Sequence, residues 1–211
     1  MATDLVEIDV TQPSAEAIER AAALIRKGRV VAIPTDSLYA LVADPFSLRA
    51  VARVFDAKGR EFTRSLPLVV SDFVMASDLA AEVTSRFEIL ARHFWPGPLT
   101  LIVPAAAKLP LKVTGNTGRL AMRQSRSSVV NALLLKLDHP MIATSANISG
   151  QPTCRSGIDT FGMMDSRVDL VLDGGFCSGP GNTTVDITDP DWKVIREGAI
   201  SQKEIATQLK Q

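Results

Sequence analysis

Short apolar runs that end in polar turns recur along the chain. The clearest example is the run at 30–33, which leads through Pro34 into Thr35, Asp36 and Ser37. A short run rich in β-branched residues predicts a buried strand, and a proline keeps the residue before it extended. Open α/β sheets bind ligands at their strand ends, so this turn is a candidate site. A turn whose side chains only bond their own backbone is the alternative.

Segments with helical spacing separate these strands. We expect helices over 14–26, 47–58, 72–94 in two pieces and 127–137, and a last helix from residue 201. Strands are expected near 66–70, 99–103, 119–123, 141–144, 169–173, 185–187 and 194–195. Ser14, Ser47 and Ser201 precede helical patterns, where a serine oxygen can accept a hydrogen bond from a free backbone N–H. No repeat or linker interrupts the pattern, so we expect a single domain over residues 1–211.

Composition narrows the class of protein. The 211 residues are 46% hydrophobic and 22% charged, which is typical of a globular protein. Lys plus Arg and Asp plus Glu both number 23, so a global field for nucleic acid is absent and any anion site must be local. Cys154 and Cys177 predict free thiols and a cytoplasmic location. We expect no signal peptide and no membrane segment, since no apolar run approaches the roughly 20 residues needed.

The polar turns and several cations suggest one anion-binding cleft. The turns lie at 35–37, 144–149 and 182–184, and the cations are Lys58, Arg60, Arg123 and Arg196. A solvated surface loop explains the basic residues of 58–64 equally well. No Ser-His-Asp order, carboxylate pair or metal-ligand cluster is recognisable, so no catalytic residue and no protein metal site is predicted. Chemistry based on positioning and charge neutralisation fits nucleotidyl or phosphoryl transfer.

Several motifs in a fixed order resemble those of one family. They are Pro34-Thr35-Asp36-Ser37-Leu38-Tyr39-Ala40-Leu41, Lys58-Gly59-Arg60, Trp95-Pro96-Gly97-Pro98-Leu99-Thr100, Ala121-Met122-Arg123, Thr144-Ser145-Ala146-Asn147, Asp173-Gly174-Gly175, Thr183-Thr184-Val185-Asp186 and Arg196-Glu197-Gly198. Each motif is weak alone, whereas their order and spacing are specific. The sequence resembles the YrdC/YciO family of threonylcarbamoyladenylate synthases across roughly residues 15 to 205.

This resemblance implies an α/β fold in which helices flank a twisted mixed sheet around a concave, positively charged cavity. The implied reaction joins L-threonine, bicarbonate or carbon dioxide and ATP into threonylcarbamoyl-AMP and pyrophosphate, with Mg²⁺ accompanying the ATP. The product feeds threonylcarbamoyl-transfer machinery that modifies tRNA. By position, Thr35 and Arg123 would hold threonine, and Thr183 would lie between the two ligands. The residues implied to hold ATP are Lys58, Arg60, Ser145, Asn147 and Arg196.

Some positions depart from the family pattern. The family commonly has Gly where this chain has Ala40 and Pro where it has Glu61, and the basic loop after Arg60 is about two residues longer. A YciO-like paralogue with weak or different nucleotide chemistry is therefore one alternative, and an RNA-binding module is another. The pattern is that of the short, single-domain form. Replacing Arg123 by Ala is expected to weaken threonine use with little effect on folding.

Overall fold

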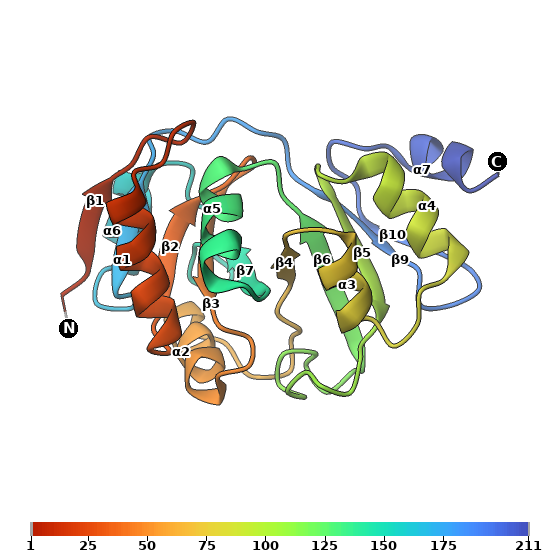
Figure 1. Cartoon of the computed structure of the whole chain (residues 1–211), viewed down its shortest axis with the longest axis horizontal. Helices are drawn as coiled ribbons and strands as arrows, with labels where there is room; N and C mark the ends of the chain where they lie inside the picture. Colours follow the sequence, from red (N-terminus) through yellow and green to blue (C-terminus); the bar gives the residue numbers. More distant parts are fainter. Residues whose placement is uncertain (1, 211) are drawn as a thin grey trace.

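One twisted mixed β-sheet runs through the whole molecule (Figure 1). The computed structural model describes residues 2–210, and within them ten strands lie in the order β1-β8-β2-β3-β7-β4-β6-β5-β9-β10. The strands are β1 (Asp4–Glu7), β2 (Val31–Pro34), β3 (Tyr39–Ala43), β4 (Leu68–Val70), β5 (Leu99–Pro104), β6 (Arg119–Gln124), β7 (Met141–Ser145), β8 (Leu170–Asp173), β9 (Thr183–Asp186) and β10 (Lys193–Arg196). Strand β8 lies parallel to β1 and β2, whereas β3 lies antiparallel to β2 and β7. The mixed sheet implied by the resemblance is confirmed.

Helices cover both faces of this sheet. They are α1 (Ala15–Arg26), α2 (Leu48–Lys58), α3 (Phe73–Leu79), α4 (Ser85–Phe94), α5 (Ser128–Leu137), α6 (Gly157–Met164) and α7 (Gln202–Gln208). The predicted caps are confirmed, because the side chains of Ser14 and Ser47 accept hydrogen bonds from backbone N–H groups at 3.3 and 3.2 Å. Gly59 ends α2 at a φ of 60°, a left-handed conformation that favours glycine. No helix within residues 2–210 is long and apolar enough to cross a membrane.

Successive side chains of β2 point to opposite faces of the sheet and belong to two different hydrophobic cores. Val31 and Ile33 pack with α1 and α5, which lie side by side over this half of the sheet (Figure 1). Ala32 points to the opposite face and joins the core that contains Tyr39 and the apolar side of α2. Because both faces are covered, β2 is buried along its whole length, as an uninterrupted apolar run predicts. The polar turn that follows β2 is thereby anchored in the protein interior.

Three elements were not among those expected from the sequence, namely β1, β3 and α6. Strand β1 is largely exposed, and it forms by parallel pairing with β8, in the register Asp4 opposite Leu170. Helix α6 is short, and its N-terminus is capped by Ser156, which accepts a hydrogen bond from the Asp159 N–H at 3.1 Å. Strand β1 forms one edge of the sheet and α6 packs against β8, whereas β9 lies next to the opposite edge.

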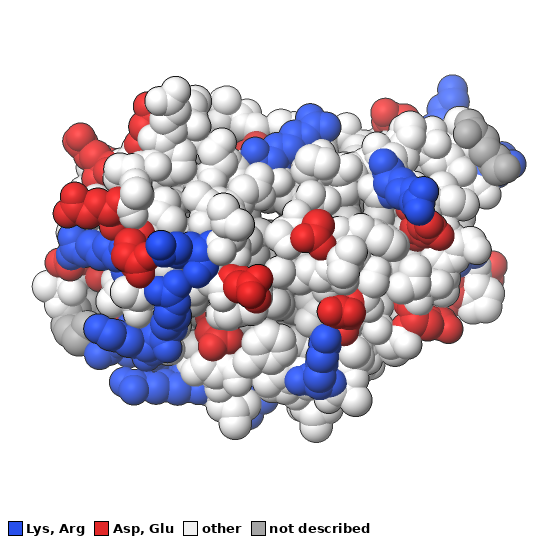
Figure 2. Space-filling model, viewed as in Figure 1, with Lys and Arg blue, Asp and Glu red and all other residues white. Residues whose placement is uncertain are grey.

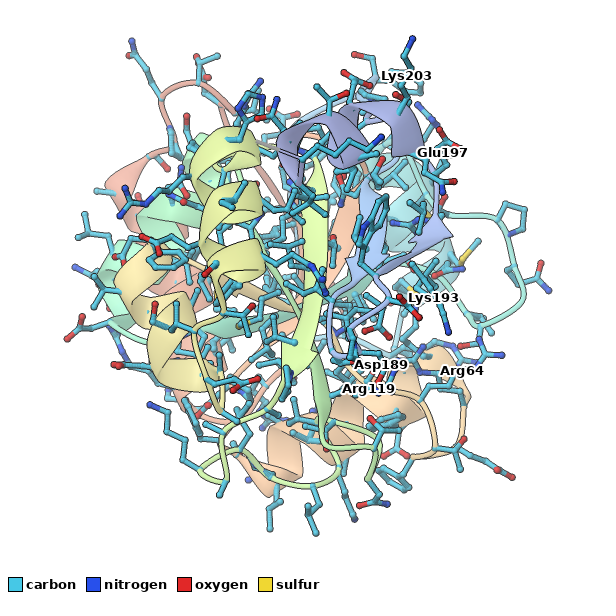
Figure 3. The ribbon with its side chains drawn as sticks, turned by 90° about the vertical axis from the view of Figure 1, so that its right-hand side faces the viewer. Arg64, Arg119, Asp189, Lys193, Glu197 and Lys203 are labelled. Atoms are coloured by element: carbon cyan, nitrogen blue, oxygen red, sulfur yellow. The ribbon has the colours of Figure 1, made fainter. Side chains whose placement is uncertain are left out.

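Charged side chains of both signs cover the surface. Lys and Arg gather over α1 and α2, at the lower left of Figure 2, and elsewhere on that face the two signs are interspersed. At the other end of the sheet, Arg119 of β6 pairs with Asp186 at 2.7 Å and with Asp189 at 3.2 Å (Figure 3). These ion pairs link β6 to the β9–β10 hairpin, which carries Arg196.

Candidate functional site

A cavity of about 430 Å³ lies where strand ends from both halves of the sheet meet. Its polar lining includes Thr35, Ser37, Ser65, Arg123, Ser125, Thr144, Ser145, Asn182, Thr184 and Arg196. The three polar turns expected to form one cleft are therefore brought together, with two of the four predicted cations among them. Sequence positions more than a hundred residues apart meet because β3, β7 and β6 lie close in the sheet order.

Arg123, near the end of β6, is fixed by hydrogen bonds to three other side chains. It is only 5% exposed, and its two Nη atoms donate to the side chains of Asn182 and Asp36, and at 3.1 Å to Ser125. Burial lowers the pKa of the guanidinium, although Asp36 acts in the opposite direction. The sequence pointed to Arg123 but gave no signal for Asp36, Ser125 and Asn182 as its partners.

Lys58 lies behind the cavity surface instead of in its lining. It is 2% exposed, and its Nζ donates to the backbone oxygens of Ser145 at 2.6 Å and of Asn147 at 3.1 Å. The Asn147 side-chain oxygen accepts from the same Nζ at 3.0 Å and from the Ser145 hydroxyl at 2.7 Å. Burial, and to a lesser degree the charge of Arg60, lowers the pKa of Lys58 to about 8. Lys58 and Asn147 thus fix the turn that presents Ser145 to the cavity.

Arg60 also lies outside the cavity lining. Its guanidinium stacks over the Phe55 ring at 5.4 Å and donates to the backbone oxygen of Ser65, a lining residue, at 3.4 Å. Burial and the nearby charge of Arg64 both lower the pKa of Arg60. Glu61, which departs from the family pattern, is exposed and does not line the cavity. It therefore places no carboxylate in the cavity wall.

The position predicted for Thr183 does not agree with the geometry. Thr183 is fully buried, and its hydroxyl donates to the Ile200 oxygen at 2.6 Å while accepting from two backbone N–H groups. Its neighbour Thr184 lines the cavity instead. Successive residues of a strand point to opposite faces, so only one of two adjacent threonines can face the cavity. The sequence did not indicate which of the two it would be.

The turn between β2 and β3 uses its hydroxyl groups partly for its own geometry. Thr35 Oγ1 donates to the Leu38 oxygen at 2.6 Å and accepts from the Ser37 and Leu38 N–H groups. The local-turn interpretation therefore holds for this hydroxyl, while the residue also lines the cavity. Tyr39, missed in the sequence, follows the turn and lines the cavity too. Its hydroxyl donates to the Gly175 oxygen at 2.8 Å, which ties the turn to the segment after β8.

The lining favours anions and offers no cage for a metal ion. It contains Arg123 and Arg196, and no Asp or Glu of the described residues belongs to it. Across residues 2–210 no group of three or more His, Cys, Asp or Glu side chains could hold a metal. The donor set suits Mg²⁺ only where phosphate oxygens supply most of its ligands.

Comparison with known proteins identifies the family of the chain. Residues 23–198 match the family model Sua5_yciO_yrdC, described as telomere recombination. The chain belongs to this family. The threonylcarbamoyl-AMP synthase of Pyrococcus abyssi is 34% identical over 189 residues, 89% of this chain and 56% of the relative. That of Bacillus subtilis is 32% identical over 190 residues, 89% of this chain and 55% of the relative. The chain thus spans just over half the length of these two relatives.

Solved structures of the family share the fold. The structure of P. abyssi Sua5 complexed with L-threonine matches with a TM-score of 0.93 and 32% identity, over 98% of this chain and 61% of that one. The structure of Escherichia coli YciO matches with a TM-score of 0.88 and 25% identity, over 96% of this chain and 99% of that one. The predicted family and the predicted fold class are both confirmed.

Proposed function

We propose that this protein is an L-threonylcarbamoyladenylate synthase, which makes threonylcarbamoyl-AMP and pyrophosphate from L-threonine, bicarbonate or carbon dioxide, and ATP. One observation carries the proposal. The cavity lining combines Arg123 and Arg196 with hydroxyl and amide groups and includes no carboxylate among the described residues. A cavity of this kind suits two anionic ligands, an amino-acid carboxylate and a polyphosphate.

Each of the two lining arginines binds a different ligand. Arg123, together with the turn at Thr35, binds the threonine carboxylate. Ser145 and Arg196 bind the phosphates, and Thr184, in place of Thr183, lies between the two ligands. Three of the residues implied to hold ATP support the cavity wall and do not line it. Lys58 and Asn147 bond the segment at Ser145, and Arg60 bonds the backbone of Ser65, so they position the groups that contact ATP.

The chemistry rests on positioning and charge neutralisation. The threonine amine attacks carbon dioxide and loses a proton, or attacks bicarbonate with loss of water, and the carbamate formed attacks the α-phosphate of ATP, with pyrophosphate leaving. Mg²⁺ bound to the triphosphate would neutralise phosphate charge. In the absence of lining carboxylates among residues 2–210, the lining hydroxyl groups such as Ser145 are the available protein ligands for that ion.

Pyrophosphate release is the direct test. Purified protein is given ATP and Mg²⁺, and L-threonine and bicarbonate are each omitted in turn. We expect release only when both are present, and at least about tenfold less with Arg196→Met, because a charged phosphate contact is lost. Arg92→Met is the matched control, since Arg92 is exposed and pairs with Glu88 on the outside of α4. Release that is independent of threonine would contradict the proposal.

A YciO-like activity is the second candidate, favoured by the match over 99% of the E. coli YciO chain. In that case ATP binds, and threonine with bicarbonate produces no pyrophosphate. Calorimetric titration with ATP, run beside the release assay, separates the two functions. Tight ATP binding without threonine-dependent release identifies the paralogue.

The remaining assignments concern partners and location. We propose that residues 1–211 form one domain, and that the protein acts in the cytoplasm and passes its product to threonylcarbamoyl-transfer machinery. RNA contact is assigned to the cations over α1 and α2 (Figure 2), which are separate from the cavity lining. Filter binding of tRNA across a salt series tests this contact, because phosphate contacts weaken steeply as salt increases. Absence of binding at low salt removes it.

A further inference from the structure

Asp36 places a carboxylate directly against the arginine that would bind the substrate carboxylate. Its Oδ1 accepts from Arg123 Nη2 and, at 2.6 Å, from the Ser125 hydroxyl. The Arg123 side chain is 6% exposed and that of Asp36 is 19% exposed, so the pair is mostly shielded from water. The positive charge of Arg123 is therefore already balanced before any ligand arrives.

A balanced pair is a poor receptor for a simple carboxylate. A second carboxylate near Arg123 is attracted by the guanidinium and repelled by Asp36, and both effects are strengthened by burial. A ligand that also carries an ammonium group removes this conflict, because its positive charge can face Asp36. The geometry thus favours a zwitterion over an anion.

The unused hydrogen-bonding atoms fit that ligand. Oδ2 of Asp36 receives no hydrogen bond from any described residue, whereas Oδ1 receives two. Arg123 has five N–H donors, and three are directed to Asp36, Asn182 and Ser125. Asp36 also lies between the lining residues Thr35 and Ser37, and it contacts two further lining residues, Arg123 and Ser125. Asp36 itself does not belong to the lining, so its free acceptor lies just behind the cavity wall, beside the lining residue Arg123.

We propose that Asp36 and Arg123 form one receptor for the α-amino-acid zwitterion, in which Arg123 binds the carboxylate and Asp36 Oδ2 accepts from the ammonium group. Asp36 is then a specificity-determining residue, which selects α-amino acids over the corresponding hydroxy acids. This assignment rests on the proposed function and deepens it, since it names the group that recognises the amine. A purely structural role of Asp36, as the counter-ion of Arg123, is the competing explanation.

Ligand discrimination separates the two roles. Calorimetry measures the binding of L-threonine and of 2,3-dihydroxybutanoate, which has a hydroxyl in place of the amine. Wild-type protein should prefer threonine by about 10- to 100-fold, the range of one charged hydrogen bond. Asp36→Asn should lose threonine affinity by the same factor and bind the hydroxy acid at least as well as before. Asp36→Glu, which keeps the charge, should retain part of the preference.

Asp4→Asn is the matched control, because it removes a carboxylate that pairs with an arginine, Arg20, at an exposed site outside the cavity lining. It should leave the preference for threonine over the hydroxy acid unchanged. Equal weakening of both ligands by Asp36→Asn would overturn the proposal in favour of the structural role. If Asp36→Asn fails to fold, the wild-type ratio decides, since equal binding of the two ligands by wild-type protein overturns it as well.

A panel of other α-amino acids and their hydroxy analogues distinguishes this inference from the proposed function. Preference for a different amino acid that disappears in Asp36→Asn supports the receptor and rejects threonine as the substrate. Absence of binding by every α-amino acid overturns the receptor, and ATP titration then reports on the nucleotide half of the proposed function alone.

Discussion

Replacing Arg123 by alanine should destabilise the folded protein as well as impair threonine binding. The sequence alone suggested a ligand contact whose removal leaves folding intact. The structure instead shows Arg123 buried and bonded to Asp36, Asn182 and Ser125. Its loss leaves the Asp36 carboxylate, 81% shielded from solvent, without a cation. The structure therefore predicts a loss of stability that the sequence did not, and its size can be worked out from these contacts.

The expected loss is about 3 kcal/mol. Removing one partner of a fully buried ion pair costs roughly 3 to 5 kcal/mol, because the other charge stays buried and unpaired. Asp36 keeps the hydrogen bond from Ser125 and is partly exposed, which places the effect at the lower end of that range. Urea unfolding at pH 7, followed by the fluorescence of Trp95 and Trp192, measures the difference.

A double-mutant cycle isolates the charge effect. Arg123→Ala combined with Asp36→Ala removes both charges, so the double variant should be more stable than Arg123→Ala alone. Arg92→Ala, at an exposed pair on α4, should lose less than about 1 kcal/mol and serves as the control. A loss below about 0.5 kcal/mol for Arg123→Ala, or no recovery in the double variant, would refute the reasoning.

Three further predictions follow from other groups. Tyr39→Phe should lose about 1 to 2 kcal/mol in urea unfolding, because the buried hydroxyl that bonds the segment after β8 is removed; an unchanged midpoint would contradict this. ATP affinity, measured by calorimetry, should fall as the pH rises from 7 to 9, because the buried Lys58 ammonium with a pKa of about 8 loses its charge. Lys58→Met should bind ATP weakly at every pH, and a pH dependence that survives in it would assign the effect to another group. Iodoacetamide at pH 8 should modify Cys154 and Cys177 at least about tenfold more slowly in folded than in urea-unfolded protein, because burial raises the pKa of both thiols. Equal rates would show that the thiols are accessible.

The elements predicted correctly are those with local signals. Ser14 and Ser47 begin helices because a cap is a contact between residues three apart, and Gly59 ends one because its conformation is local. Strand β1 lacks such a signal, and the local cap of helix α6 at Ser156 was missed. Strand β1 is mostly exposed, and it forms by pairing with β8, more than 160 residues later. Pairing over that distance is a property of the fold and leaves no periodicity in the sequence.

The residues of the candidate site also fall into those with a local signal in the sequence and those that depend on the fold. Strand ends followed by polar residues are visible in the sequence, and they supplied Thr35, Ser145 and Arg196 as lining residues. Which side chain of a polar pair faces the cavity depends on strand register, so Thr183 was chosen where Thr184 faces inward. The contact of Asp36 with Arg123 joins residues 87 positions apart, and nothing local in the sequence predicts it.

The basic loop after α2 shows how the structure decides between a solvated loop and a ligand site. The two buried cations within residues 2–210 differ in their partners, because Arg123 pairs with Asp36 whereas Lys58 bonds only oxygens of Ser145 and Asn147. None of the ion pairs within residues 2–210 includes Lys58, Arg60 or Arg64, although Arg64 lowers the pKa of Arg60 and Arg60 lowers that of Lys58. Lys58 is buried and Arg60 is half-buried, so the repulsion between their like charges raises the free energy of the folded protein, whereas Arg64 is exposed to water. A polyphosphate beside Ser145 and Ser65, the wall segments that Lys58 and Arg60 hold, would relieve that repulsion, so the loop is better explained as half of an anion site than as a solvated surface.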